Sequence, residues 1–294
     1  MHIIKSWITL TSLLLIACSC SDDEEIISDS TTPTHPTIET IDLPKHLGIK
    51  NGEAKMFTMP TPLQMGTALN IMDVSYNGSL LLPHGNISAS SDIYLSLALG
   101  MYLTDLGYTT VYSDLQESIR YAGDIQLVMD ELPIAFYIND GFKNRFNENK
   151  ENKDSLCKII LEGYNEANQH IIETKNEGLG LLVLTGAYIE SLHLVFSSDF
   201  SDDYAEGFSK VVIQQILFLD NFIILLDGFK ENPHILTILN NLNELKNVFS
   251  TFEIYFNGNS QSYNLKKTLT ESDIPKIKER VDNLRDNVLS NLYN

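Results

Sequence analysis

Two short stretches of the chain carry the same order of small, aromatic and ionisable residues. The sequences LALGMYLTDLGY (97–108) and VLTGAYIESLHL (183–194) align without gaps. If the two stretches met in space, their hydroxyl, carboxyl and imidazole groups could orient a small polar molecule. The predicted ligand pocket comprises Tyr102, Asp105, Tyr188, Glu190 and His193.

The same alignment matches Gly100 with Gly186, which favours a structural role for the repeated motif. Glycine inside a helix costs up to about 1 kcal/mol relative to alanine, so a matched pair predicts a close helix crossing where a Cβ atom would clash. Tyr102 and Tyr188 would then be packed side chains whose hydroxyls bond to neighbours. The packing role and the ligand role are alternatives that the sequence leaves open.

The spacing Gly-x-Tyr-x-x-Asp/Ser is similar to the Gly-x-His-x-x-Glu motif of imelysin-like proteins, which are duplicated, all-helical and exported. Tyrosine replaces the histidine in both copies, and Asp105 or Ser191 stands where the glutamate would be. These departures weaken a metal-binding interpretation of the motif, so we carry over neither a metal ion nor a cofactor from this family.

Motifs for catalysis are missing from the sequence. It contains no Gly-x-Ser-x-Gly elbow, His-Glu-x-x-His pair, phosphate-binding glycine loop or dinucleotide fingerprint. The histidines share no common spacing, and carboxylate pairs are frequent because the chain is acidic. We expect a protein without catalytic residues, and a hydrolase that uses dispersed carboxylates is the weaker alternative.

Apolar residues at helical spacing fill the chain from about residue 60 onward, which predicts an all-α bundle of about eight or nine helices. The echo of the two motifs suggests a duplicated three-helix unit within it. Strand-like alternation is scarce; TFEIYF (251–256) is its best example and fits a helix end equally well. The expected helices span 61–76, 91–107, 110–132, 139–148, 153–175, 177–197, 204–229, 232–256 and 272–292.

The segment 207–226 is long and apolar enough to suggest a membrane span, but it contains Lys210 and Asp220. A charged residue near the middle of a membrane helix costs about 2.5–3.5 kcal/mol on insertion scales. A helix that is apolar on nearly all sides is otherwise the centre of a bundle. We therefore expect this segment to be the central core helix.

The N-terminus has the layout of a secretory signal peptide over residues 1–17, with an apolar stretch from Trp7 to Ala17. That stretch is much shorter than the roughly 20 residues of a membrane-spanning helix. The sequence Leu15-Ile16-Ala17-Cys18 resembles the lipobox of bacterial lipoproteins. The resemblance implies that Cys18 is lipidated and becomes the first residue of the mature protein.

An acidic block follows the cysteine and resembles the surface-export tag of lipoproteins of the Bacteroidota: Ser21, Asp22, Asp23, Glu24 and Glu25. The tag implies an outer-membrane lipoprotein that faces the cell exterior; a solvated acidic linker on a periplasm-facing protein is the alternative. Residues 18–59 are rich in Ser, Thr, Pro and acids, which predicts a disordered tether. Within it, Asp29-Ser30-Thr31 resembles the O-glycosylation acceptor of the same phylum, so Ser30 is a candidate site.

The formal net charge is −19, with 39 acidic and 20 basic residues. Such a chain repels phosphate backbones and anionic membrane surfaces, which excludes nucleic-acid binding and leaves the lipid as the membrane attachment. The whole chain resembles the all-helical lipoproteins of the Bacteroidota. We expect a non-enzymatic binding module over residues 60–294 with a protein or glycan partner at the cell surface. The alternative is a protein with a small-molecule or metal pocket near the Gly-x-Tyr helices.

Overall fold

The computed structural model describes residues 61–85, 87, 91–132, 140–174, 177–199, 205–257, 262–267, 269–270 and 272–293. The predicted signal peptide, the tether, Cys18, the acidic block at 21–25 and Ser30 lie outside the described residues. Helices dominate the described part, and its only sheet has two strands, so the predicted all-α fold is confirmed.

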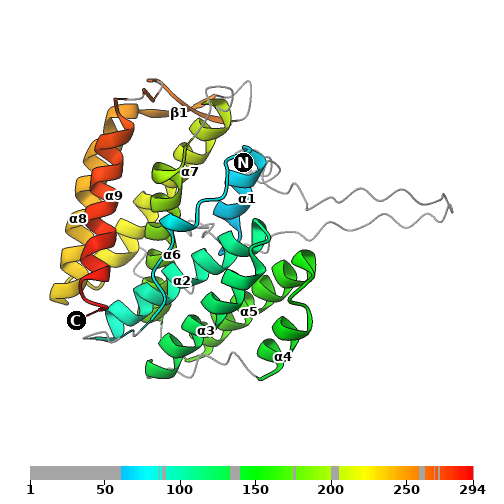
Figure 1. The fold of residues 1–294 in the computed structure, drawn as a ribbon. Coiled ribbons are helices and arrows are strands. Elements are labelled where there is room, and N and C mark those ends of the chain that lie inside the picture. The colour runs from blue at the N-terminus through cyan, green and yellow to red at the C-terminus, as the bar shows by residue number, and fades with distance from the viewer. Residues whose placement is uncertain are drawn as a thin grey trace, which may run out of the picture.

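The elements follow the chain as shown in Figure 1. They are α1 (Gln64–Ile71), the 3₁₀ turn η1 (Gly78–Leu80), α2 (Asp92–Val111), α3 (Leu115–Glu131), α4 (Asp140–Glu148), α5 (Lys153–Thr174), α6 (Glu177–Ser197), α7 (Ala205–Asp227), α8 (Pro233–Phe249), the 3₁₀ turn η3 (Ser250–Phe252), β1 (Ile254–Asn257), β2 (Ser262–Leu265) and α9 (Ile274–Leu289). Eight of the nine expected segments contain one of these α-helices. The exception is 91–107, because α2 begins there but continues to Val111, four residues past the expected end.

Residues at the helix ends explain several of the boundaries. The side chain of Asp114 accepts a hydrogen bond from the Glu117 N–H and so caps the start of α3. The side chain of Asn232 does the same for α8, where Pro233 occupies the first turn and needs no hydrogen-bond acceptor.

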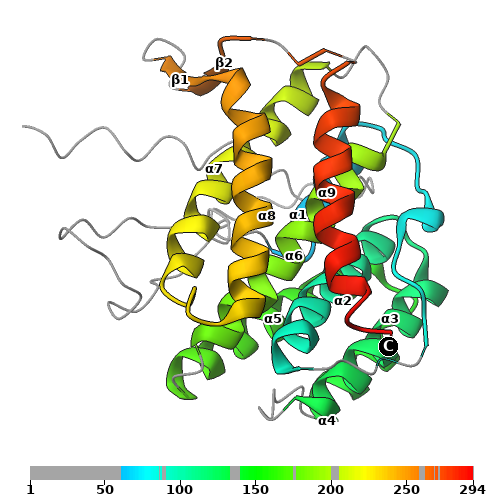
Figure 2. The same ribbon diagram turned by 90° about the vertical axis from the view of Figure 1, so that its left-hand side faces the viewer.

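Helices α2 and α6 form the centre of the molecule and make the most extensive contact between any two elements. Figures 1 and 2 show the other helices around this pair, with α8 and α9 on one side and α3, α4 and α5 on the other. Both central helices are buried around nearly their whole circumference, as expected for helices that are apolar on all sides.

The predicted close crossing at the two glycines is confirmed. A Cβ atom on Gly100 would lie 1.8 Å from the carbonyl oxygen of Val183, and one on Gly186 would lie 1.9 Å from that of Leu97. Each glycine thus lets its helix rest directly on the backbone of the other helix. No side chain can replace the missing hydrogen at either position without moving one helix.

The likeness between the two halves is confined to this crossing. Helix α3 packs along α2, as the second helix of the first unit should, but α7 has few contacts with α6. The neighbour of α6 on that side is α9 instead. The packing therefore does not repeat the three-helix unit that the sequence echo suggested.

The prediction that 207–226 is the central helix is wrong. Among the described residues, two segments are long and apolar enough to cross a membrane, Gly178–Ser197 in α6 and Gly207–Asp227 in α7, and they are 94% and 50% buried. Helix α6 holds the central position because its glycine crossing brings it against α2, whereas α7 covers one flank. Its Asp220 pairs with Lys246 at 2.6 Å near the surface.

The expected helix over 232–256 is too long. Helix α8 ends at Phe249, and Glu253 has a φ of 36°, which a helix cannot continue through. The chain then forms β1, which pairs antiparallel with β2 from Ile254 opposite Leu265 to Asn257 opposite Ser262. The hydrogen-bond partners of β1 lie in β2, a later segment of the chain. The local sequence pattern of 251–256 therefore cannot reveal that β1 forms a strand.

Candidate functional site

Four of the five predicted pocket residues gather beneath one extended segment of the chain. This segment, residues 80–84, begins at the last residue of η1 and runs across the bundle towards α2, and we call it the strap. Tyr102, Asp105, Glu190 and His193 are all buried and reach the strap directly or through one neighbour. They come from α2 and α6, the two helices of the glycine crossing.

Tyr188 does not belong to this group. Its hydroxyl donates to the carbonyl oxygen of Gln215 in α7 at 2.9 Å, and its ring stacks on Phe222 at a centroid distance of 4.9 Å. The helix explains this difference, because residues two apart point to nearly opposite sides whereas residues three apart share a side. Glu190 and His193 therefore share a face that Tyr188 cannot reach.

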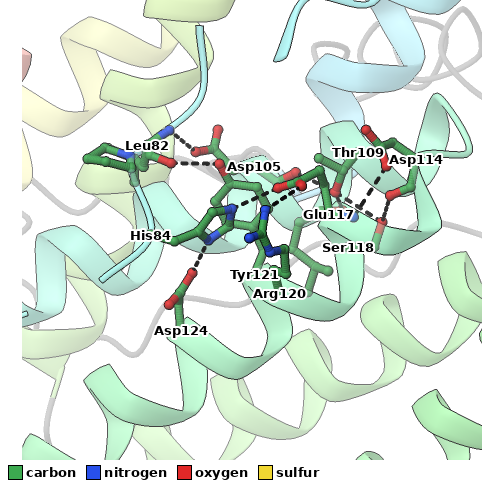
Figure 3. A network of polar contacts seen from close by, with 12 residues as sticks. Leu82, His84, Asp105, Thr109, Asp114, Glu117, Ser118, Arg120, Tyr121 and Asp124 are labelled. Atoms are coloured by element: carbon green, nitrogen blue, oxygen red, sulfur yellow. Dashed lines mark hydrogen bonds and ion pairs between the residues drawn. The ribbon is translucent and has the colours of Figure 1, made fainter. Parts of the chain in front are cut away.

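Four backbone polar groups of the strap are hydrogen-bonded to side chains: the Leu80 carbonyl oxygen, the Leu82 N–H, the Leu82 carbonyl oxygen and the Pro83 carbonyl oxygen. The Leu82 N–H donates to Asp105 Oδ2 at 2.8 Å, and the Leu82 carbonyl oxygen accepts from the Tyr121 hydroxyl at 2.7 Å, as Figure 3 shows. One residue on, the Pro83 carbonyl oxygen accepts from the hydroxyls of Tyr102 at 3.0 Å and Tyr293 at 3.3 Å.

The Leu80 carbonyl oxygen is held by two cation-forming side chains. His193 Nε2 lies 3.2 Å from this oxygen and must donate, since a carbonyl oxygen only accepts. Arg285 Nη2 donates to the same oxygen, also at 3.2 Å. Burial lowers the pKa of His193, although the Asp282 carboxylate, 3.2 Å from Nδ1, acts in the opposite direction.

Arg285 also forms a bidentate ion pair with Glu190. Its Nε and Nη2 each lie 2.8 Å from one carboxylate oxygen, and the Glu190 side chain has no exposed surface. Burial lowers the pKa of Arg285, but the charge of Glu190 and its hydrogen bonds raise it. The second effect prevails, so the pKa of Arg285 lies above its ordinary value. The two parallel hydrogen bonds give the pair the bidentate geometry of a strong Arg–carboxylate contact inside the protein.

Arg285 is the central residue of the site that the sequence interpretation missed. It lies on α9 beside the apolar stripe that contains Val281, Leu284 and Val288, all of which are buried. A cation on the flank of a buried stripe must have a partner, and this was the available signal. The identity of the partner depends on the packing of α9 on α6, which the sequence pattern does not specify.

Asp105 differs from Glu190 because it has no cationic partner in hydrogen-bond contact. Its Oδ2 accepts from Leu82, while its Oδ1 is buried without a hydrogen-bond partner. Burial raises the pKa of Asp105 well above its usual range, and the charge of Glu190 adds to the effect. The neutral acid is thus favoured at this position.

The outer end of the strap is fixed by His84. Its Nδ1 lies 2.5 Å from Asp124 Oδ2, and its Nε2 lies 2.7 Å from Glu117 Oε2, both on α3 (Figure 3). Arg120 pairs with the other oxygen of Glu117 at 2.8 Å. Partial burial lowers the pKa of His84, but the hydrogen bonds to the two carboxylates outweigh it and raise the pKa above its ordinary value.

The buried polar side chains of this site hold a peptide segment, the strap. The groups that could act as acid, base or nucleophile are hydrogen-bonded to the strap or to each other. A ligand would reach Asp105 or Glu190 only after the strap had left its place. In the described ranges, no group of three or more His, Cys, Asp or Glu side chains could hold a metal ion.

Comparisons with protein-family models, with curated proteins and with solved structures found no match to this chain. Its function is therefore inferred from its residues and geometry.

Proposed function

We propose that the protein is a lipid-anchored outer-membrane lipoprotein that acts as a non-enzymatic binding module at the cell surface. The observation that carries this proposal is the sequence Leu15-Ile16-Ala17-Cys18 at the end of a short apolar stretch. Two or three acyl chains on one residue give stable anchoring, whereas a single chain gives only marginal binding.

The contacts of the buried polar residues support a binding role over an enzymatic one. Asp105, Glu190 and His193 are the side chains best suited to acid–base chemistry in the core. Each is hydrogen-bonded to the strap or to Arg285. Catalytic groups need a site where a reacting atom lies within about 3 Å, and the strap occupies that position.

Replacement of Cys18 tests the anchor. Cys18→Ala should abolish labelling of the protein by radioactive fatty acid and release the protein from membranes. Cys20→Ala is the matched control, because it removes the neighbouring thiol and should leave labelling intact. Labelling that persists in Cys18→Ala would show that the lipid is attached elsewhere and would refute the proposal.

A further inference from the structure

A surface pocket of about 540 Å³ lies between α8 and α9, at the end nearest the β1–β2 hairpin and away from the strap. Figures 1 and 2 both show these two helices side by side. The volume is within the roughly 300–1,000 Å³ that is usual for small-molecule sites in proteins.

Helical spacing builds the two walls of this pocket. One wall carries Glu244, Val248 and Thr251, which are three or four residues apart on α8 and η3. The opposite wall carries Lys276 and Arg280, one turn apart on α9.

The end of the pocket combines an apolar surface with a third cation. The Nζ atom of Lys267 lies 5.3 Å from the centroid of the Phe252 ring, which is almost fully buried. Val248 continues this apolar surface along α8. Asn247, on the same side of α8, adds an amide that can donate and accept hydrogen bonds.

The charge of the lining is opposite to that of the protein. Three cations and two carboxylates line the pocket, in a chain whose formal net charge is −19. Arg280 pairs with Glu244 at 2.9 Å across the groove. Lys267 and Lys276 share the other carboxylate, that of Asp273, at 3.5 and 3.8 Å.

The shared carboxylate leaves the two lysines incompletely neutralised. Asp273 Oδ2 already accepts from the N–H and the hydroxyl of Thr270. Each lysine ammonium has three donors, so two ammonium groups on one carboxylate keep both positive charge and unused N–H groups. An anion in the pocket would supply the missing acceptors.

From this geometry we propose that the pocket binds a small hydroxylated organic anion of the sugar-acid class. Lys267, Lys276 and Arg280 hold its carboxylate. The groups of Glu244, Asn247 and Thr251 bond to its hydroxyls, and Val248 and Phe252 support its carbon skeleton. This inference rests on the proposed function, because it specifies the ligand of the binding module.

The overall charge limits the size of the ligand. A long polyanion would extend over the acidic surface and be repelled, whereas a single sugar acid stays within the basic pocket. At physiological ionic strength charges are screened beyond about 8 Å, so the rest of the molecule acts only weakly on a small anion.

Isothermal titration of the purified full-length protein with galacturonate, and in parallel with neutral galactose, tests this inference. We expect saturable binding of galacturonate that weakens as salt is added, and no binding of galactose. The absence of saturable galacturonate binding, or equal binding of both sugars, would overturn it.

Variants that remove a positive or a negative charge from the pocket make the test specific. Lys276→Gln and Arg280→Gln should each weaken galacturonate binding at least about tenfold, as expected for the loss of a charge-assisted hydrogen bond. Glu244→Gln should tighten binding a few-fold, because it removes the competing carboxylate. All three side chains are substantially exposed, so the fold should be unaffected.

Lys158→Gln on α5, which is also exposed, is the matched control and should bind like the wild type. Equal losses in Lys158→Gln and Lys276→Gln would contradict a site between α8 and α9. This titration detects the pocket, whereas fatty-acid labelling detects the anchor on Cys18, so either proposal can fail without the other.

Discussion

At the scale of single residues, two buried carboxylates beneath the strap have different partners. Glu190 forms a bidentate ion pair with the guanidinium of Arg285. Asp105 has a backbone N–H and no cationic hydrogen-bond partner, and its pKa is raised. The difference arises from α9, which supplies one cation and places it against α6.

Two substitutions of Asp105 separate its hydrogen bond from its charge. Asp105→Ala leaves the Leu82 N–H buried without an acceptor and should destabilise the protein by about 1–3 kcal/mol. Asp105→Asn keeps an acceptor and removes the ionisable group, so it should be clearly less harmful in urea denaturation.

The raised pKa of Asp105 determines how its contribution to stability changes with pH. A carboxyl whose pKa is raised in the folded state contributes stability below its unfolded pKa of about 3.9, and that contribution is lost as the pH rises towards the folded pKa. Asp105→Asn should therefore gain stability relative to the wild type as the pH rises from about 4. A loss at neutral pH equal to that of alanine would show that the ionised form is needed.

His84 allows a second pH-dependent test, at the outer end of the strap, with the same sign as that for Asp105. Its raised folded pKa means that its contribution is complete below the unfolded pKa of about 6.5 and is lost as the pH rises through the folded pKa. The destabilisation caused by His84→Gln should be largest near pH 6 and should shrink towards about pH 9. Denaturation at a series of pH values measures this change. A difference in stability between wild type and His84→Gln that stays constant with pH would contradict a charged contact between His84 and the carboxylates of Asp124 and Glu117.

Part of the candidate site could be predicted from the spacing of residues in the repeated motif. Tyr102 and Asp105 are three apart on α2, and Glu190 and His193 are three apart on α6, so each pair was bound to share a face. Tyr188 was grouped with them by sequence likeness alone, although it is only two residues from Glu190. Arg285 and the strap could not be placed in this way, because their contacts depend on tertiary packing.

At the scale of elements, the hydrophobic period was sufficient to find the helices, since apolar residues at steps of three and four must face a core. The strap has no such period. Its conformation is set by hydrogen bonds to side chains of α2, α3, α6 and α9. The β1–β2 hairpin and the position of α7 could not be predicted for the same reason, because contacts with distant segments of the chain determine both.

The glycine crossing allows a direct test of how α2 and α6 meet. Gly100→Ala and Gly186→Ala would each place a Cβ within 2 Å of a carbonyl oxygen, so each should destabilise the protein by about 1–3 kcal/mol or more. Thermal denaturation measures the effect.

Gly123→Ala is the matched control for this crossing. Gly123 lies in the middle of α3, and a Cβ there would meet no atom within 4 Å. The substitution should stabilise the protein by up to about 1 kcal/mol through helix propensity alone. Similar effects at all three glycines would remove the argument for close contact.

At the scale of the whole molecule, the protein is an acidic helical body with a strap that closes its polar core, and we propose that a lipid on Cys18 anchors it. A formal net charge of −19 favours solubility, and a pocket with more cations than carboxylates stands out against it. The ligand is therefore expected at the α8–α9 pocket and not beneath the strap.

The acidic block behind Cys18 predicts the side of the membrane that the protein faces. Replacement of Asp22, Asp23, Glu24 and Glu25 with alanine should protect the protein from protease added to intact cells, because the export tag is lost. Replacement of the neighbouring pair Ile26 and Ile27 is the control and should leave cleavage unchanged. Undiminished cleavage of the alanine variant would mean that the block is only a linker.

The most direct test of the account is the mass of the N-terminal peptide of the mature protein, isolated from membranes of the native host. The account predicts a peptide that begins at Cys18 and carries the added mass of two or three acyl chains. An unmodified Cys18, or a peptide that still contains residues 1–17, would contradict the anchor.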